Sequence, residues 1–179
     1  FRNFANDKDI IFQSDDGSGG VTAYMLLDGS TNAVTFYKTL EIKDNVYASF
    51  GNGGDLAIYH DGSNSYVKNH FGDLYFNQYA DDKSIIFQND DGAGGLEVYF
   101  RLEGASGGGQ PFTVFPDSSV LSFGTGHDLR IEHTGSHSVI DNYVGDVIFT
   151  NNTDDGDMIF KSDDGSGGTT AYLTLDGGL

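Results

Sequence analysis

Paired aspartates recur in three Gly-rich blocks and could offer carboxylate oxygens to a cation. The pairs occupy matched positions, namely Asp15, Asp16, Asp90, Asp91, Asp163 and Asp164. Hard oxygen ligands of this kind suit Ca²⁺, but the ligand spacing of an EF-hand loop is absent. The blocks also lie about 75 residues apart, whereas calcium β-rolls repeat their motif about every nine residues. Since Asp before Gly is ordinary turn chemistry, we expect structural turns, with calcium as the alternative and no other cofactor.

Two of the five histidines, His60 and His133, stand at the same position of a repeated segment. The alternation of each segment predicts that both side chains lie on the inward face of a strand. In a homotrimer, three copies of such a histidine could surround the axis and bind a metal ion. The alternative, which we favour, is a half-buried histidine whose ring bonds to a neighbouring backbone carbonyl.

No arrangement of side chains predicts catalysis, and we expect that the chain is not an enzyme. A pair of carboxylates could hydrolyse a glycosidic bond, but the 27 acidic residues fall mostly at repeated turn positions. Four tyrosines on the predicted outward phase of their strands could stack on sugars, namely Tyr24, Tyr59, Tyr99 and Tyr172. Packing between neighbouring strands predicts the same residues. A host-surface glycan is therefore a partner that the residues alone do not define.

The composition argues against several classes of partner. The 179 residues include 27 acidic and 9 basic ones, which gives a formal net charge of −18. Nucleic acids and anionic membranes attract Lys and Arg, so we expect neither as a partner. No run of 18 apolar residues occurs, so no membrane insertion is expected. Cysteine is absent, which excludes disulfides and cysteine zinc sites.

The elements that position these residues belong to an internal repeat of about 75 residues. Residues 9–29 and 157–177 are identical at 16 of 21 positions, and residues 84–104 match the first copy at 12 positions. Looser correspondences join 53–69 to 126–142 and 72–77 to 145–150. Identity at this level indicates tandem units of one architecture.

The repeats predict the domain organisation. We expect one β-repeat at 1–77, a second at 78–150 and the start of a third at 151–179. Because the chain begins and ends partway through a repeat, we interpret it as a fragment of a longer protein.

Short β-branched and aromatic runs between Gly-rich turns predict an all-β fold. Seven strands are expected in the first repeat, at about 9–14, 22–28, 34–39, 46–50, 55–60, 65–69 and 73–78. Turn signals at this spacing are typical of a sandwich, a barrel or a solenoid.

Alternation within these strands predicts one buried face. Leu56 and Ile58 share the phase of His60, while Ala57 and Tyr59 point away. The other residues predicted to face inward are Leu129, Ile131, Met25, Leu27, Phe100, Leu102, Leu173 and Leu175. The opposite phase varies freely, with Leu26, Arg101 and Thr174 at one position of the repeat.

The phrases DIIFQSDDGSGG, TAYLTLDG and GGDLAIYHDGSNSYV resemble repeats in large virion structural proteins of tailed phages, notably cyanophages. The resemblance covers nearly the whole chain and points to tail-fibre or related appendage proteins. It implies an elongated, fibre-like β-structure, a virion or extracellular location, and contacts with other virion proteins. It also implies intertwined homotrimers with chains parallel to the fibre axis. Since a unit of short strands buries only a small core by itself, we expect Leu56, Ile58, Leu129 and Ile131 to meet at such an axis.

Two alternatives from other classes follow from the same residues. One is an extracellular bacterial adhesin or surface module that binds calcium in its Gly-rich turns. The other is a polysaccharide-degrading tailspike. Calcium-dependent stability would distinguish the first, and release of reducing sugar the second.

Overall fold

The computed structural model describes residues 1–104 and 108–178, and within them the chain forms strands β1 to β14 and no helix. The all-β prediction is confirmed. No helix in the described part of the chain is long and apolar enough to cross a membrane. The chain divides into two units, Phe1–Phe76 and Asn77–Leu179. The separation of residues 78–150 from 151–179 stays a prediction.

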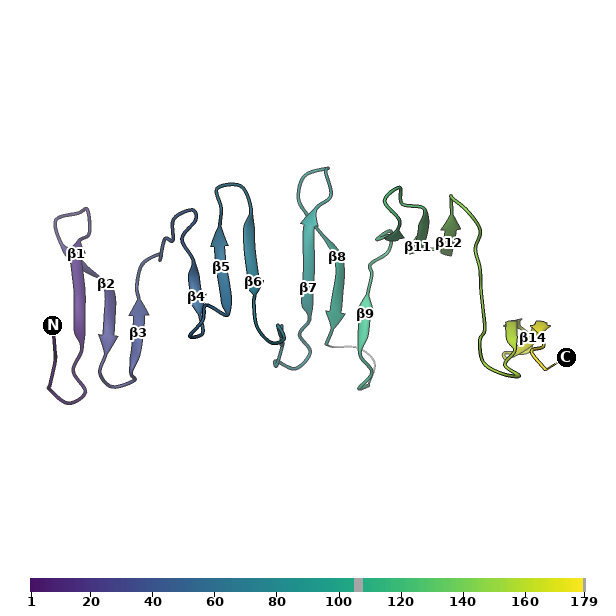
Figure 1. Cartoon of the computed structure of the whole chain (residues 1–179), viewed down its shortest axis with the longest axis horizontal. Coiled ribbons are helices and arrows are strands. Elements are labelled where there is room, and N and C mark those ends of the chain that lie inside the picture. Colours follow the sequence, from purple (N-terminus) through teal and green to yellow (C-terminus); the bar gives the residue numbers. More distant parts are fainter. Residues whose placement is uncertain (105–107, 179) are drawn as a thin grey trace. The chain divides into compact units, whose positions relative to one another are not determined.

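Three of the sheets begin with a hairpin that is closed by a Gly-rich turn, and we call them the bulged sheets. They comprise β1 (Ile10–Asp15), β2 (Val21–Asp28) and β3 (Ala33–Phe36); β7 (Ile85–Asp90), β8 (Leu96–Glu103) and β9 (Phe112–Val114); and β13 (Met158–Asp163) with β14 (Thr169–Leu175). Strands that follow one another in the chain pair antiparallel in each sheet (Figure 1).

Two further sheets have three short strands in chain order without a bulge, and we call them the plain sheets. They comprise β4 (Ala48–Phe50), β5 (Leu56–His60) and β6 (Ser65–Asn69), and β10 (Leu121–Phe123), β11 (Leu129–His133) and β12 (Ser138–Asn142). Their pairing is antiparallel throughout (Figure 1). None of the described sheets closes into a barrel.

A β-bulge interrupts the hairpin of every bulged sheet at the same place. In the first sheet the register shifts between Phe12 and Gln13, so Tyr24 on β2 has no residue opposite it. Tyr99 on β8 and Tyr172 on β14 are the equivalent extra residues. A bulge breaks the alternation of side chains along its strand. The assignment of residues to an inward or outward face by counting from the strand end therefore does not hold past these tyrosines.

The pairing registers assign each strand residue of the plain sheets to one of two faces. The constant face has the same apolar centre in both sheets, with Ala48, Phe50, Leu56, Ile58 and Val67 in one and Leu121, Phe123, Leu129, Ile131 and Ile140 in the other. The polar residues on this face are also the same in both copies, namely His60, Ser65 and Asn69 and their counterparts His133, Ser138 and Asn142. The opposite, variable face changes its chemistry, from Ala57, Tyr59, Tyr66 and Lys68 in one to Arg130, Glu132, Val139 and Asp141 in the other. Both copies therefore keep apolar side chains that favour burial on the constant face but not on the variable face.

The single chain nevertheless leaves the constant face uncovered. Ile58 and Ile131, which were predicted to be buried, are 45% and 40% exposed. The buried side chains among the described residues are Leu26 and Ala57, at 8% and 6% exposed, and both lie on the phase predicted to point outward. The prediction of one buried face is therefore wrong for the isolated chain. The reason is that, within each unit, strands of different sheets do not contact one another, so no second layer covers either face.

The predicted strand at 73–78 is also absent. Residues 71–84 contain no strand, and neither does the equivalent stretch 143–157. Both stretches hold apolar runs with the composition of a strand, but a strand needs a neighbour to pair with. Neither run has one within the described chain.

Candidate functional site

The Gly-rich turns hold their paired aspartates in hydrogen bonds to the turn itself. Asp16 Oδ1 accepts from the Ser18 N–H at 2.8 Å, the Ser18 hydroxyl at 2.7 Å and the Gly20 N–H at 3.1 Å. Asp15 Oδ1 accepts from the N–H of Gly17 at 2.8 Å. Gly17 has a φ of 79°, a left-handed conformation that glycine adopts without strain. The sequence of the block thus encodes the turn completely.

The turn at Asp163 and Asp164 repeats this arrangement, whereas the turn at Asp90 and Asp91 keeps only the bonds to the N–H groups two residues ahead. Asp164 accepts from the N–H and hydroxyl of Ser166, both at 2.8 Å, and from the N–H of Gly168 at 3.1 Å. Asp163, Asp90 and Asp91 each accept from the N–H two residues ahead, over 2.7, 2.5 and 2.8 Å. The bond from the serine hydroxyl is the main cause that lowers the pKa of Asp16 and Asp164 below the ordinary value.

This geometry limits what the turns can offer to calcium. In each pair of aspartates, one oxygen of each carboxylate already accepts a hydrogen bond from a backbone N–H group. Ca²⁺ takes six to eight oxygen ligands, so few oxygens remain for it in one turn. Among the described residues, no three Asp, Glu or His side chains lie together as a metal-binding group. The turn geometry has a complete structural explanation, and calcium binding in these turns remains a prediction to test.

His60 ends β5 on the constant face and bonds to the turn before β4. Its Nδ1 lies 3.1 Å from Asp44 Oδ1 and 3.0 Å from the N–H nitrogen of Gly62. The Asn45 N–H donates to the His60 carbonyl at 2.8 Å and ties the same turn to the strand. A protonated Nδ1 donates to Asp44, and an unprotonated Nδ1 accepts from Gly62. The predicted bond from the ring to a backbone carbonyl is therefore replaced by these two partners.

His133 has the same environment in the second plain sheet. Its Nδ1 lies 2.9 Å from Asp117 Oδ1 and 3.1 Å from the Gly135 nitrogen, and the Ser118 N–H donates to the His133 carbonyl at 2.7 Å. With Nδ1 engaged, a metal ion could be bound only through Nε2. A metal-binding histidine is usually supported by a carboxylate on its other ring nitrogen, as Asp117 supports His133. Each plain sheet of one chain, however, supplies only one histidine of this kind.

An aromatic cluster with one ammonium group distinguishes the first plain sheet. The Tyr59 ring stacks on Tyr66 at 4.9 Å and packs tilted against Tyr47 at 4.4 Å. Lys68 Nζ lies 4.9 Å from the Tyr59 centroid and 4.7 Å from the Tyr66 centroid. Its hydrogen bond to the Tyr59 hydroxyl is the main cause that raises the pKa of Lys68. These contacts give the cluster a cross-strand packing role.

The other tyrosines considered for sugar stacking are the bulge residues. Their hydroxyls donate to the backbone carbonyl that ends the preceding strand, over 3.4 Å for Tyr24, 3.2 Å for Tyr99 and 3.1 Å for Tyr172. A tyrosine at this position ties the bulge to the Gly-rich turn. The structure thus gives all four tyrosines a local structural role, each in a different sheet.

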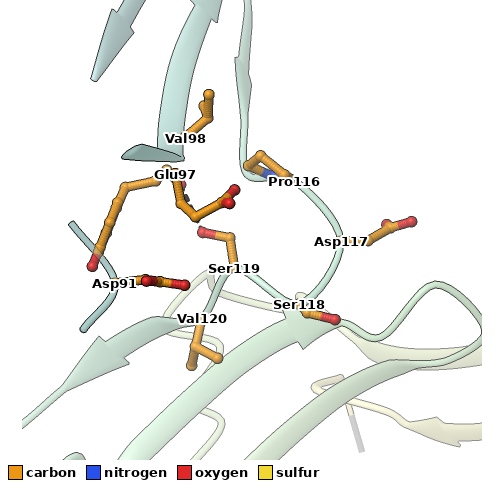
Figure 2. Close-up of a pocket in the computed structure, with 9 residues that line it drawn as sticks. Asp91, Glu97, Val98, Pro116, Asp117, Ser118, Ser119 and Val120 are labelled. Atoms are coloured by element: carbon orange, nitrogen blue, oxygen red, sulfur yellow. Dashed lines mark hydrogen bonds between the residues drawn. The ribbon is translucent and has the colours of Figure 1, made fainter. Parts of the chain in front are cut away.

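A shallow hollow of about 430 Å³ lies between the β7–β8 hairpin and residues 116–120 (Figure 2). Ser119 donates to the Tyr99 carbonyl at 2.7 Å and ties the two sides together. Asp91, Glu97 and Asp117 are among the residues that line the hollow (Figure 2).

Sequence reasoning missed the partners of the two histidines, although a signal for them was present. Asp44 precedes His60 by 16 residues, and Asp117 precedes His133 by the same number. A glycine follows two residues after each histidine. This shared spacing could have identified the Asp–His–Gly arrangement, because the rest of these turns differs between the copies.

No protein-family model matches the chain, and neither a curated protein nor a solved structure matches it.

Proposed function

We propose that the chain is a structural segment of a tailed-phage virion appendage, a tail fibre or similar shaft, and that it assembles as a parallel homotrimer. One observation carries the proposal: among the described residues, only Leu26 and Ala57 are buried. Burial of apolar surface is the dominant favourable term in folding. A chain rich in Ile, Val, Leu, Phe and Tyr therefore needs other chains to cover these side chains.

The accessible area of the single chain agrees with this need. Its solvent-accessible surface is 14,538 Å². A folded monomer of the same mass exposes about 8,500 Å² on the scaling that globular proteins follow. The excess of about 6,000 Å² lies in the range that permanent complexes bury, about 2,000–5,000 Å² or more. Chains that assemble obligately are the expected source of such an excess.

The constant faces are the surfaces that best fit another copy of the chain. Their strand residues carry no formal charge, whereas the variable faces carry Lys68, Arg130, Glu132 and Asp141. At a net charge of −18, copies approach each other with the least repulsion where no acidic side chain intervenes. Each copy presents the same apolar surface, so identical faces can cover one another around a symmetry axis.

The width of the plain sheets supports a threefold axis. Three strands spaced by about 4.8 Å make a sheet roughly 14 Å wide. Three such sheets joined as a prism lie about 4 Å from their common axis, close to half of the roughly 10 Å between packed sheets. A pair of sheets packs equally well face to face but leaves four strand edges open, which is a hazard that a closed prism avoids. The resemblance to fibre proteins favours three chains as well.

In this arrangement the variable faces point outward and the role is mechanical, not catalytic. The segment acts as a stiff spacer or receptor-facing shaft in the extracellular virion, in contact with other virion proteins. The surface on the plain sheets that best fits a host-surface glycan is the cluster of Tyr47, Tyr59 and Tyr66 with Lys68. No nucleic acid or membrane partner is proposed.

Labelling of purified phage particles tests this function. Antibodies raised against the chain should decorate an appendage of particles that encode it when viewed by electron microscopy. Decoration of a bacterial cell surface would instead support the adhesin alternative, and then calcium should raise the melting temperature by many degrees. Particles without any decoration would overturn the virion assignment. Release of reducing sugar from a host polysaccharide would contradict a purely structural role.

A further inference from the structure

The connection between β12 and β13 exposes an apolar segment that pairs with no strand within the described chain. It contains the segment GDVIFT at 145–150, in which Val147, Ile148 and Phe149 are 49%, 80% and 64% exposed. The segment runs as an extended stretch of chain between the two strands (Figure 1). The repeat provides an equivalent segment, GDLYFN at 72–77, where Tyr75 and Phe76 are also exposed.

The backbone N–H groups of 146–150 have no partner within the described residues either. Hydrogen bonds fix the chain on both sides, from the Tyr143 N–H to the Asp128 carbonyl at 2.7 Å and from the Gly156 N–H to the Thr153 carbonyl at 3.0 Å. Asn142 Nδ2 donates to the Gly145 carbonyl at 2.7 Å and sets the direction in which the segment leaves the sheet. Within the described residues, no N–H from 146 to 150 donates to a backbone carbonyl. An apolar, extended segment is thus anchored at its start and unpaired along its length.

Every sheet of the chain also has unpaired edges. In the first bulged sheet, which is not part of the proposed prism of plain sheets, β1 and β3 each pair only with β2, so the outer side of each strand has free N–H and C=O groups. Edge strands of this kind accept an additional strand readily. Each copy of the chain therefore holds both halves of a β-pairing, the unpaired segment and the open edge, and does not join them within itself.

We propose that 145–150 is an intermolecular β-strand, which adds to an open sheet edge of a second copy of this chain. The inference rests on the proposed function, because it needs an assembly of identical chains. The contact joins two different surfaces, and such a heterologous contact closes into a ring under threefold symmetry. The repeat gives residues 72–77 the same role. This pairing satisfies the backbone, covers the apolar run and interlocks the chains.

A simpler alternative is that the side chains of 145–150 pack against another copy without backbone pairing. The two arrangements differ in the amide hydrogens. Amides bonded between strands exchange slowly with solvent, whereas amides of a segment held only by its side chains exchange quickly. A proline also distinguishes them, because it removes an N–H but tolerates an extended backbone.

Hydrogen exchange on the assembled wild-type chain, read by mass spectrometry of peptides, tests the proposal. Peptides covering 146–150 should exchange at least 10-fold more slowly than the same peptides of the chain unfolded in urea, which serve as the reference. Ile148→Pro should remove this protection and weaken assembly at least 10-fold, whereas Ile148→Ala, which keeps the N–H, should retain most of the protection.

The outcomes separate this proposal from the proposed function. A wild-type chain that stays monomeric would overturn both. An oligomer whose residues 146–150 exchange as fast as in the unfolded chain would overturn only the intermolecular strand. An oligomer in which Ile148→Pro assembles as well as Ile148→Ala would do the same, since an unpaired extended segment accepts proline at no cost.

Discussion

Placing a charge on the constant face should disrupt assembly, and neighbouring residues of β12 provide a matched pair of variants. Ile140 lies on the constant face opposite Ile131, and Val139 lies on the variable face opposite Glu132. Ile140→Lys and Val139→Lys each change the net charge by one in the same direction. A difference between them therefore reports the face and not the charge.

The expected magnitude follows from the exposure of Ile140. The residue is 61% exposed in the single chain, and complete burial of an isoleucine side chain is worth about 1.5–3 kcal/mol. Covering the rest of it thus contributes about 1–2 kcal/mol per chain, or about 3–5 kcal/mol per trimer. Loss of this term weakens assembly by roughly 100-fold to several thousand-fold, since 1.4 kcal/mol is a factor of ten. Burial of the ammonium group in place of the methyls adds to the loss.

Sedimentation velocity over a range of protein concentrations measures this effect. We expect Ile140→Lys to be monomeric at concentrations where wild type and Val139→Lys are fully assembled. Ile140→Val, which keeps an apolar side chain, controls for a general loss of folding and should assemble like wild type. The reasoning is refuted if Ile140→Lys assembles normally, or if Val139→Lys weakens assembly to the same degree.

Three further predictions concern the turns. In a urea titration, Gly29→Ala should destabilise the chain by about 1–3 kcal/mol, because the added Cβ would lie 3.1 Å from the carbonyl carbon of Lys8 and closer still to its oxygen. The control Gly53→Ala should destabilise the chain less, because its Cβ meets only an Asp55 carboxylate oxygen, at 3.1 Å. An equal loss of stability in the two variants would count against the backbone clash. The hydroxyl of Ser30 is the main cause that lowers the pKa of Asp28 to about 2. The ionised carboxylate therefore stabilises the fold above about pH 4, and this stabilisation is lost as the pH falls toward 2. The difference in melting temperature between wild type and Asp28→Asn should shrink over that range, and a difference independent of pH would contradict the assignment. Calcium titration with and without EDTA should leave the melting temperature nearly unchanged, since Asp16 already bonds to Ser18 and Gly20, and a rise of many degrees would show that the turns bind the ion.

The sequence predicted the strands far better than their surroundings. The expected strand at 65–69 forms at Ser65–Asn69, and that at 55–60 forms at Leu56–His60. These strands are defined locally, by alternation and by the Asp-Gly turn between them. The expected strand at 73–78 does not form, because a pairing partner is a property of the whole assembly and not of the segment.

The candidate site shows the same division. The turn chemistry of Asp16 was predictable because donor and acceptor lie within four residues of each other. The bulge at Tyr24 was not, since it depends on a register shift between two strands. Burial of the constant face was predicted from alternation, but alternation says only that a face should be covered and not which chain covers it. The inward phase thus identified a surface without identifying its partner.

The most direct test of the account is the mass of the wild-type chain in solution, by multi-angle light scattering at moderate salt and high protein concentration. We expect a single species of about 58 kDa, three times the 19.3 kDa chain. Because each chain carries a charge of −18, the fraction assembled should rise with salt. A species of 19.3 kDa that unfolds cooperatively would contradict the account, since a chain with its apolar faces in water would then be stable alone.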